Sequence, residues 1–378
     1  MGNSFYSINT EETEDNILLK KVRDQEDMIK TLQNEICILK KKGLVNSLDD
    51  DILKCIEQSK HDHNYEYLVL SGGSIKGICF TGALETLDEL NILYSDTTEL
   101  KLKGIAGTSA GSIIASLLAV GYTPKELKEI MSNIDFEEIV DDKLGYIRDT
   151  INFVEDWGAC PGNYIMELLG DLIKQKTGNA DYTLEDLMND KKIQLVIVTT
   201  DMNYEKSIYL YGGNPIKSYS DIPIRVAVRM SIGIPGLFEP YEYNNSYFVD
   251  GGLLDNYPLH VFDSEYPGDP KSRLNLCSPN PKVLGLKIMP SDENKNYDVV
   301  DKNEIDSLFS YFTTFVNMFL VENDRRIMTP SFWMRTVFID TPNYPLTKFS
   351  ITDDEMTQLI ESGKQCTNKF FLNDSVKN

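Results

Sequence analysis

Basic residues are few in this chain of 378 residues, and the deficit excludes one large class of partners. Lys and Arg number 37 against 59 Asp and Glu, so the formal net charge is −22 at pH 7. A chain this acidic repels phosphate backbones, and we expect no nucleic-acid partner. The charge also disfavours electrostatic attraction to anionic lipid, although apolar side chains can still insert into a membrane surface.

The sequence also lacks a long hydrophobic run. No segment approaches the roughly 20 consecutive apolar residues that cross a bilayer, and the first residues are polar where a secretory signal carries an apolar stretch. The six cysteines include no Cys-x-x-Cys pair, and their spacing fits neither a zinc site nor a disulfide framework. We therefore predict a cytoplasmic protein with reduced thiols.

Residues 1–64 differ in character from the rest and are predicted to form an N-terminal extension. Apolar residues recur at steps of four and three from 18 to 39, the pattern of a coiled coil, within a helix of about 16–42. About three heptads, with Gln25 in the seam, make a marginal coiled coil. Either the helix mediates self-association through residues 18–39, or it packs as an amphipathic helix on the chain's own body.

After this extension the sequence alternates between short apolar runs and helical patterns. The apolar runs are typical of buried strands, which we predict at 67–70, 102–106, 193–200, 208–211 and 283–289. Helical patterns follow the first two of these runs, the second at 113–120. Strands that alternate with helices predict an α/β fold, in which a mostly parallel central sheet carries helices on both faces.

A serine stands between a predicted strand and a predicted helix in the pattern Gly-x-Ser-x-Gly. The five residues are Gly107-Thr108-Ser109-Ala110-Gly111. This pattern forms a sharp elbow that exposes the serine hydroxyl, and its glycines avoid clashes in the strained turn. The helix that follows directs its positive dipole end at developing negative charge. Ser109 is therefore the candidate nucleophile, and a simple glycine-rich turn is the alternative.

A second glycine-rich turn, Gly72-Gly73-Ser74-Ile75-Lys76-Gly77, follows the strand at 67–70. Consecutive glycines let neighbouring N–H groups converge on an anion, as in an oxyanion hole or a phosphate cradle. The turn fits neither Gly-x-x-x-x-Gly-Lys-Ser/Thr nor Gly-x-Gly-x-x-Gly. Two such turns at the carboxyl edge of one sheet would place a nucleophile beside an anion-binding loop, which suits acyl transfer.

A serine nucleophile needs a base, and the scarcity of histidine limits the choice. The chain has three histidines, His61, His63 and His260. Only His260 is well placed in the sequence, although it lies in an apolar stretch that also suits a core histidine. Asp250 ends an apolar strand, and the two glycines after it allow close approach to another backbone. The residues alone leave both bases open.

Taken in order, these blocks resemble the patatin-like phospholipases. That family carries a glycine-rich anion loop, a Gly-x-Ser-x-Gly elbow and a distant Asp-Gly-Gly, as at 72–77, 107–111 and 250–252 here. Further blocks resemble the family's segment before the aspartate and its cap region, at 227–240, 162–169 and 182–187. The resemblance runs from about Tyr67 to Met289. It implies a three-layer α/β sandwich, with a catalytic domain at 65–290 and a C-terminal helical segment at 291–378.

The resemblance also implies roles for the residues of these motifs. Ser109 would be the nucleophile and Asp250 the general base of a dyad without histidine. The N–H groups of Gly72, Gly73 and Ser74 would hold the oxyanion. The residues that support the motifs would be Lys76, Gly77, Gly107, Gly111, Gly251 and Gly252. Two positions depart from the family pattern, which usually has a third glycine at Ser74 and more often Arg at Lys76.

The reaction implied by the resemblance is hydrolysis of an acyl ester in a phospholipid or other lipid, through an acyl-enzyme on Ser109 and without a metal or other cofactor. Apolar residues recur at helical spacing from 305 to 320. This stripe would either meet a membrane surface or an acyl chain, or form the core face of a C-terminal helix. We expect transient, peripheral contact with lipid surfaces.

Two alternatives to the dyad enzyme stay open. One is an esterase that uses His260 as the base for Ser109. The other is a catalytically silent lipid-binding or scaffold protein that self-associates through residues 18–39. At the C-terminal end, Thr352-Asp-Asp-Glu355 fits a capping box, which predicts that a helix begins there and runs toward Phe371.

Overall fold

The computed structural model describes residues 48–94, 99–139, 157–274, 276–290, 329–345 and 348–372, together with a few positions between 305 and 319. The chain divides into two compact units, residues 1–52 and 53–378. The predicted coiled-coil helix at 16–42 lies outside the described residues and stays a prediction. The first described helix is α2 (Leu48–His61).

The centre of the larger unit is a mixed sheet with strand order β10-β9-β1-β2-β4-β8-β7, in which β5 also pairs with β4. The parallel strands are β1 (Tyr67–Leu70), β2 (Gly104–Thr108), β4 (Gln194–Asp201), β9 (Val283–Pro290) and β10 (Thr336–Thr341). The antiparallel strands are β5 (Lys206–Tyr211), β7 (Tyr241–Tyr243) and β8 (Ser246–Asp250). A separate pair joins β3 (Gly158–Cys160) and β6 (Gly236–Phe238). The predicted mostly parallel α/β sheet is confirmed.

The helices follow the pattern expected for such a fold. Those with long buried faces are α3 (Cys79–Glu89), α4 (Ala110–Val120), α5 (Pro124–Asn133), α8 (Asn163–Thr177), α9 (Leu184–Lys191), α11 (Ile224–Ser231) and α16 (Asp353–Leu372). The short helices are η1 (Ser74–Ile78), α6 (Phe136–Ile139), α10 (Lys217–Ser220), α12 (Gly252–Asp255), η2 (Leu259–Phe262), α13 (Pro270–Arg273) and α15 (Pro330–Met334).

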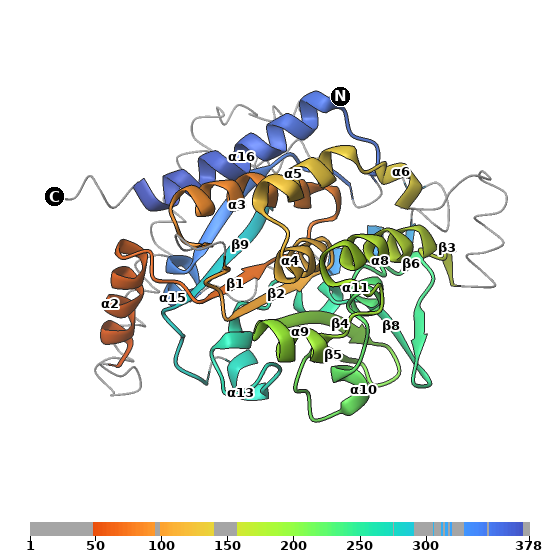
Figure 1. Ribbon diagram of the computed structural model, residues 1–378, viewed down its shortest axis with the longest axis horizontal. Helices are drawn as coiled ribbons and strands as arrows, with labels where there is room; N and C mark the ends of the chain where they lie inside the picture. Colours follow the sequence, from red (N-terminus) through yellow and green to blue (C-terminus); the bar gives the residue numbers. More distant parts are fainter. Residues whose placement is uncertain are drawn as a thin grey trace, which may run out of the picture. The chain divides into compact units, whose positions relative to one another are not determined.

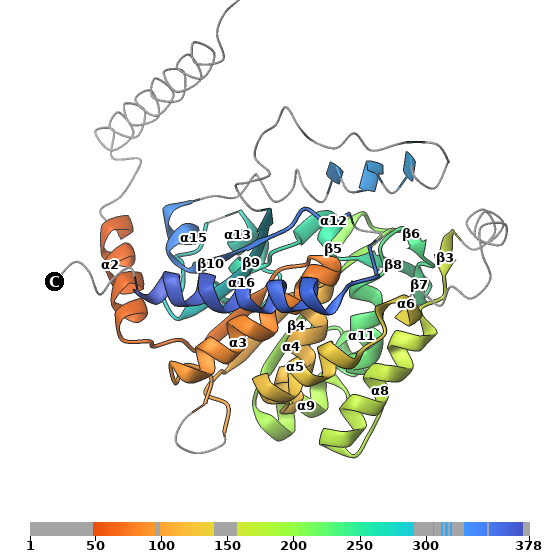
Figure 2. The same cartoon turned by 90° about the horizontal axis from the view of Figure 1, so that it is seen from above.

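Both faces of the sheet are buried, by different sets of elements. Successive residues of a strand point to opposite faces. Accordingly Leu68 and Leu70 of β1 join the core beneath the long helices, whereas Val69 joins a second core with residues of η2 and α15. Figures 1 and 2 show α3, α5 and α16 gathered on one side of the sheet. Burial on both faces explains why these strands are continuous apolar runs in the sequence.

The second strand of the sequence lies two residues later than predicted. It was expected at 102–106, but β2 covers Gly104–Thr108 and pairs with β1 from Tyr67↔Gly104 to Leu70↔Gly107. Because β1 starts at Tyr67, which pairs with Gly104, residues 102 and 103 have no residue of β1 to pair with. The strand thus runs on to Thr108, and helix α4 begins directly after Ser109 rather than at residue 113.

The C-terminal helix is tied to the rest of the unit by capping and by close packing. As predicted, Thr352 and Glu355 form a capping box, in which the Glu355 N–H donates to Thr352 Oγ1 and Glu355 Oε2 accepts the Thr352 N–H. Helix α16 packs on α3 through two glycines. A Cβ on Gly82 would overlap the carbonyl oxygen of Ile360, and one on Gly363 would overlap that of Cys79.

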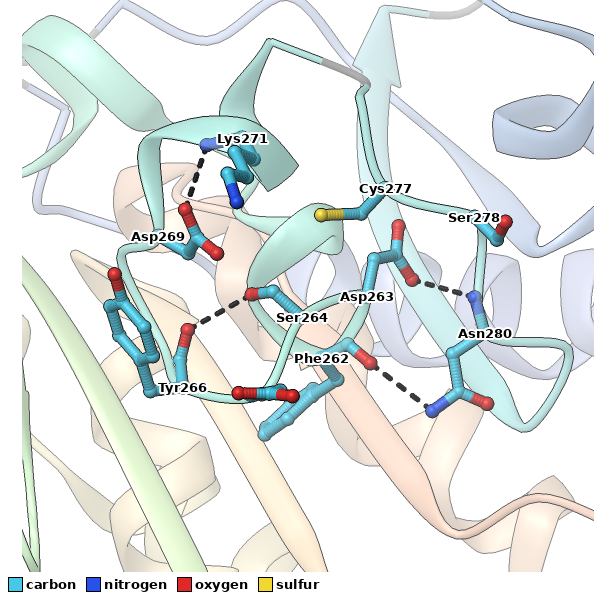
Figure 3. A pocket seen from close by; sticks show the side chains of 10 residues that line it. Phe262, Asp263, Ser264, Tyr266, Asp269, Lys271, Cys277, Ser278 and Asn280 are labelled. Carbon is cyan, nitrogen blue, oxygen red and sulfur yellow. Dashed lines mark hydrogen bonds between the residues drawn. The ribbon is translucent and has the colours of Figure 1, made fainter.

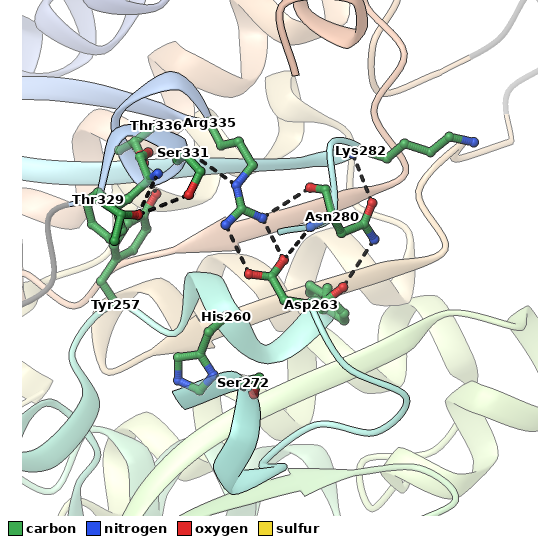
Figure 4. A network of polar contacts seen from close by, with 12 residues as sticks. Tyr257, His260, Asp263, Ser272, Asn280, Lys282, Thr329, Ser331, Arg335 and Thr336 are labelled. Atoms are coloured by element: carbon green, nitrogen blue, oxygen red, sulfur yellow. Dashed lines mark hydrogen bonds and ion pairs between the residues drawn. The ribbon is translucent and has the colours of Figure 1, made fainter. Parts of the chain in front are cut away.

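A buried ion pair fixes strand β10 to the segment after η2. Arg335 donates to Asp263 through both Nη1 and Nη2, over 2.6 and 3.0 Å, and its Nη1 also donates to the carbonyl oxygen of Asn280. Figure 4 shows this group of contacts. A two-pronged Arg–carboxylate contact restricts geometry more than a single bond does.

The contact between α3 and α16 can be tested with Gly363→Ala. The added methyl group would strike backbone, so α16 must shift, and we expect a loss of about 1–3 kcal/mol in the free energy of unfolding. This loss occurs although alanine favours helix by roughly 1 kcal/mol over glycine. Asn368→Ala, at an exposed position of the same helix, is the control. Equal melting temperatures for Gly363→Ala and the wild type would contradict the packing argument.

Candidate active site

Ser109 occupies a strained turn between β2 and α4. Its backbone has φ 51° and ψ −128°, a conformation that L residues seldom adopt. A Cβ on Gly107 would lie 2.5 Å from the Gly111 carbonyl oxygen, and a Cβ on Gly111 would lie 2.5 Å from that of Ser71. Both glycines of the Gly-x-Ser-x-Gly motif are therefore required by backbone packing around the elbow.

The hydroxyl of Ser109 donates a hydrogen bond of 2.6 Å to Oδ2 of Asp250. Asp250 is the last residue of β8, where it pairs with Thr199 of β4, the strand next to β2. Its other carboxylate oxygen, Oδ1, accepts the N–H of Gly252 over 2.7 Å. Both members of the pair are buried, with Asp250 only 2% exposed. The two residues that the sequence analysis singled out thus come together although 141 positions separate them.

The environment changes the acidity of Asp250. Burial raises the pKa of its carboxyl group to about 6, while the hydrogen bonds from Ser109 and from the Gly252 N–H act in the opposite direction. At neutral pH the group is therefore largely ionised. It also binds a proton more strongly than an ordinary aspartate, as a general base should.

Ser231, which the sequence analysis did not single out, connects the backbone at Ser109 with the backbone that follows Asp250. Ser231 Oγ accepts the backbone N–H of Ser109 over 2.9 Å and donates to the Val198 carbonyl oxygen over 2.6 Å. The carbonyl oxygen of Ser231 accepts the N–H of Gly251. A Cβ on Gly251 would overlap the Val198 carbonyl. Its position within block 227–240 was the only signal for Ser231 in the sequence.

The glycine-rich loop lies directly against the nucleophile. A Cβ on Gly72 would be 3.2 Å from Cβ of Ser109. The Gly72 N–H donates to the carbonyl oxygen of Asn256 over 3.0 Å, and among the described residues the Gly73 N–H has no acceptor. Ser74 has φ 52°, in the left-handed region, which explains why glycine is usual at this position.

The remaining loop residues form η1, which packs on the nucleophile helix. A Cβ on Gly77 would be 2.9 Å from Cβ of Ala110, the first residue of α4. Lys76 is half-buried in η1, and its N–H donates to the Gly73 carbonyl oxygen over 3.2 Å. Gly252 begins α12, two residues after Asp250.

Known proteins resemble this chain over the region that holds the site. The profile of the family described as patatin-like phospholipase matches residues 68–263, more than half of the chain. This chain belongs to the patatin-like phospholipase family.

Curated relatives of this patatin-like protein include an uncharacterized protein, YqhO, of Bacillus subtilis (strain 168). It is 28% identical over 316 residues, which cover 80% of this chain and 96% of the relative. A probable lipid hydrolase, 463L of Invertebrate iridescent virus 6, is 31% identical over 202 residues, or 52% of this chain and 63% of the relative. A cGAMP-activated phospholipase of Escherichia coli (strain TW11681) is 22% identical over 243 residues, 62% and 65% of the two chains.

Among solved structures, VipD from Legionella pneumophila shares the fold. It aligns with a TM-score of 0.50 and 18% sequence identity, and the match covers 82% of this chain and 67% of that one. At this identity the similarity supports the architecture of the patatin-like unit and nothing finer.

The histidines of this patatin-like protein lie in other surroundings. In η2, His260 Nε2 is 3.0 Å from Asp255 Oδ2, and its Nδ1 is 3.2 Å from Ser272 Oγ. Burial raises the pKa of Asp255, but the nearby His260 and the hydroxyl of Tyr209 more than offset this, so the pKa lies below its usual range. His61 is exposed on α2, and His63 contacts Phe371.

A polar pocket of about 690 Å³ lies between residues 262 and 280 of the patatin-like unit (Figure 3). Two of its carboxylates make structural contacts. Asp263 binds Arg335, and Asp269 Oδ1 accepts the N–H of Lys271. Neither Ser109 nor Asp250 lines it. Within the described ranges, no group of three or more His, Cys, Asp or Glu side chains is arranged to hold a metal ion.

The raised pKa of Asp250 predicts that Asp250→Asn stabilises this patatin-like protein at pH 8. A carboxyl group with a pKa raised by folding contributes stability below about pH 4, and that contribution is lost as the pH rises through about 6. The neutral amide of Asn does not titrate, so the variant avoids this loss in the free energy of unfolding, which amounts to about 3 kcal/mol for a pKa shift of this size. Melting temperatures should therefore differ at pH 8 and converge at pH 4. A variant less stable than wild type at pH 8 would contradict the shift.

The left-handed conformation of Ser74 yields a matched pair of variants. Ser74→Gly fits this conformation without strain, so we expect wild-type reactivity of Ser109 toward a fluorophosphonate and a stability change below about 1 kcal/mol. Ser74→Val places a β-branched side chain in the same conformation, and we expect it to displace the loop and slow labelling at least about 10-fold. Equal labelling rates in both variants would show that the loop conformation is irrelevant to Ser109.

Proposed function

We propose that this protein is a lipid acyl hydrolase of the phospholipase A or lysophospholipase type. The observation that carries the proposal is the 2.6 Å hydrogen bond from Ser109 to the buried Asp250, inside a strained elbow and beside a glycine-rich loop. The names of two relatives, a probable lipid hydrolase and a phospholipase, support a lipid ester as the substrate. The negative net charge of the chain disfavours nucleic acid, and its membership of the patatin-like phospholipase family favours a phospholipid or another acyl lipid.

In this mechanism Ser109 Oγ attacks the ester carbonyl carbon while its proton passes to Asp250 Oδ2. The tetrahedral intermediate carries an oxyanion, which backbone N–H groups of the glycine-rich loop hold. The Gly72 N–H already donates to the carbonyl oxygen of Asn256, so we assign the oxyanion to the Gly73 N–H, with Ser74 as the second donor that the family resemblance implies. Gly72 contributes by its missing side chain, because a Cβ there would crowd Ser109.

The intermediate collapses as Asp250 returns the proton to the leaving alcohol oxygen, which frees the alcohol and leaves the acyl group on Ser109. A water molecule then attacks the acyl-enzyme, and its proton passes to Asp250. Collapse of the second intermediate returns the proton to Ser109 and releases the fatty acid. Each step uses one base, and no other ionisable side chain is required.

The geometry favours Asp250 over His260 as this base. Asp250 accepts the Ser109 hydroxyl directly, whereas both ring nitrogens of His260 face Asp255 and Ser272. An esterase based on His260 would need these contacts to break before the imidazole could reach Ser109.

Exposed apolar side chains support transient contact with a lipid surface. Part of the predicted stripe, including Phe309, lies outside the described residues. Within the described part Val316 is buried, whereas Phe315 and Phe319 are about half exposed with ring centres 4.9 Å apart. Exposed phenylalanine side chains can insert into the boundary between headgroups and acyl chains, as they do on the apolar face of an interfacial helix. Among the helices that the structure describes, none is long and apolar enough to cross a bilayer.

We further propose that the protein acts in the cytoplasm as a peripheral visitor to lipid surfaces and that residues 18–39 mediate its self-association. The division of residues 1–64, 65–290 and 291–378 into an extension, a catalytic domain and a C-terminal segment is part of this proposal. Two elements of the C-terminal segment join it to the catalytic domain: β10 pairs with β9 at the edge of the central sheet, and helix α16 packs on α3. The segment is therefore not purely helical.

The test is fluorophosphonate labelling of wild type, Ser109→Ala, Asp250→Asn and His260→Gln, with the modified peptide mapped by mass spectrometry. We expect labelling of wild type at Ser109, none in Ser109→Ala and a loss of at least about 1,000-fold in Asp250→Asn. His260→Gln should retain labelling. The wild-type rate should rise with pH through about 6, because Asp250 must be ionised to accept the proton.

Two outcomes would contradict the proposal. Loss of labelling in His260→Gln with Asp250→Asn unaffected would assign the base to histidine. A folded wild type that stays unlabelled, with and without phosphatidylcholine vesicles, would favour a silent lipid-binding protein. Where the wild type is labelled at Ser109, release of fatty acid from the same vesicles shows that an acyl ester of a phospholipid is cleaved.

A further inference from the structure

Asn256 lies at the point where the nucleophile and the glycine-rich loop meet. Its backbone carbonyl oxygen accepts the N–H of Gly72 over 3.0 Å. A Cβ built on Gly72 would overlap the side-chain Oδ1 of Asn256 and would also lie 3.2 Å from Cβ of Ser109. The amide of Asn256, the Cα of Gly72 and the side chain of Ser109 therefore surround one small space.

The residue before Asn256 is anchored to the nucleophile elbow. The carbonyl oxygen of Asp255 accepts a hydrogen bond of 3.1 Å from Thr108 Oγ1, and Thr108 directly precedes Ser109. The Asp255 carboxylate accepts the Tyr209 hydroxyl over 2.7 Å and lies 3.0 Å from His260 Nε2. Both groups contact the same carboxylate oxygen, Oδ2, and together they restrain the rotation of this buried side chain.

The residue after Asn256 is anchored to the other half of the sheet. The hydroxyl oxygen of Tyr257 lies 3.0 Å from Thr336 Oγ1 of β10, and Figure 4 shows the two side by side. The Tyr257 ring packs edge-on against Phe332, and the ammonium group of Lys287 lies 5.1 Å from its centre. Gly285 makes room for the ring, because a Cβ there would overlap the Tyr257 hydroxyl.

We propose that Asn256 is a positioning residue for the acyl transfer, an inference that rests on the proposed function. Held on both sides, it fixes the glycine-rich loop at the distance from Ser109 that the oxyanion requires. Its carbonyl oxygen accepts the Gly72 N–H, and its side-chain Oδ1 fills the space beside Gly72. The bond from Gly72 to Asn256 assigns the oxyanion donors to the residues after Gly72. A displacement of about 1 Å at a reacting group can cost 100-fold in rate.

The charge of the Asn256 side chain also suits its position beside Gly72. The amide is neutral, so it adds no negative charge beside the oxyanion that forms next to Ser109. A carboxylate of the same shape would repel the oxyanion in the transition state, while the ground state of a neutral ester would be affected far less. The effect should therefore fall on the chemical step and not on binding.

The experiment measures the fluorophosphonate inactivation constants of wild type, Asn256→Asp and Asn256→Ala, together with their melting temperatures. We expect the maximal inactivation rate to fall by roughly 10-fold in Asn256→Ala and by at least about 100-fold in Asn256→Asp. The inhibitor concentration at half-maximal rate should stay within about 2-fold. Asn189→Asp, on the exposed side of α9, is the control and should behave as wild type.

The order of the two variants separates positioning from a merely structural role. A side chain that only filled space would be replaced better by aspartate than by alanine, and that order, or wild-type rates in both variants, would overturn the inference. The failure of the proposed function has a different signature, because wild-type Ser109 would then stay unlabelled, and both proposals would fall together. Because Asn256→Asp is isosteric, it tests the inference even where Asn256→Ala does not fold.

Discussion

The hydrogen bond between Ser109 and Asp250 is the constraint on which the rest of the site depends. It can form only because β4 continues beyond the end of β2, so that the antiparallel strand β8 pairs with its extension and ends beside the nucleophile elbow. The parallel part of the sheet supplies the elbow, and the antiparallel part supplies Asp250, the proposed base.

The same interaction helps to determine how strongly Asp250 binds a proton. The carboxylate of Asp250 is removed from water, and its partners are the Ser109 hydroxyl and the Gly252 N–H rather than a cation. An Asp with a cation beside it would hold its proton weakly, whereas this one holds it more strongly than usual. In the proposed mechanism, burial therefore gives Asp250 the affinity for a proton that histidine has in a classical triad.

Much of the fold and the two central residues could be predicted from the sequence because their signals are local. Apolar runs marked the strands, Gly-x-Ser-x-Gly marked the elbow at Ser109, and Asp-Gly-Gly marked the strand end at Asp250. The displaced ends of β2 were missed because pairing with β1 sets them.

The supporting residues were missed for a related reason. Ser231 and Asn256 act through bonds to Ser109 and Gly72, far away in the chain, and neither carries a pattern of its own. The departure at Ser74 was visible in the sequence, but its meaning, a left-handed backbone, became clear only in the structure.

The close contacts of the glycines around the elbow have a consequence for how such a site can change over time. At Gly107, Gly111 and Gly251 the neighbouring atoms are backbone, so no rearrangement of a side chain can make room for even one methyl group. The geometry of the elbow is therefore set by close contacts between backbone atoms, and a side chain at any of these three glycines would disrupt it. Divergence in the choice of acyl chain or headgroup must therefore arise in the surrounding helices and loops, where side chains can still be exchanged.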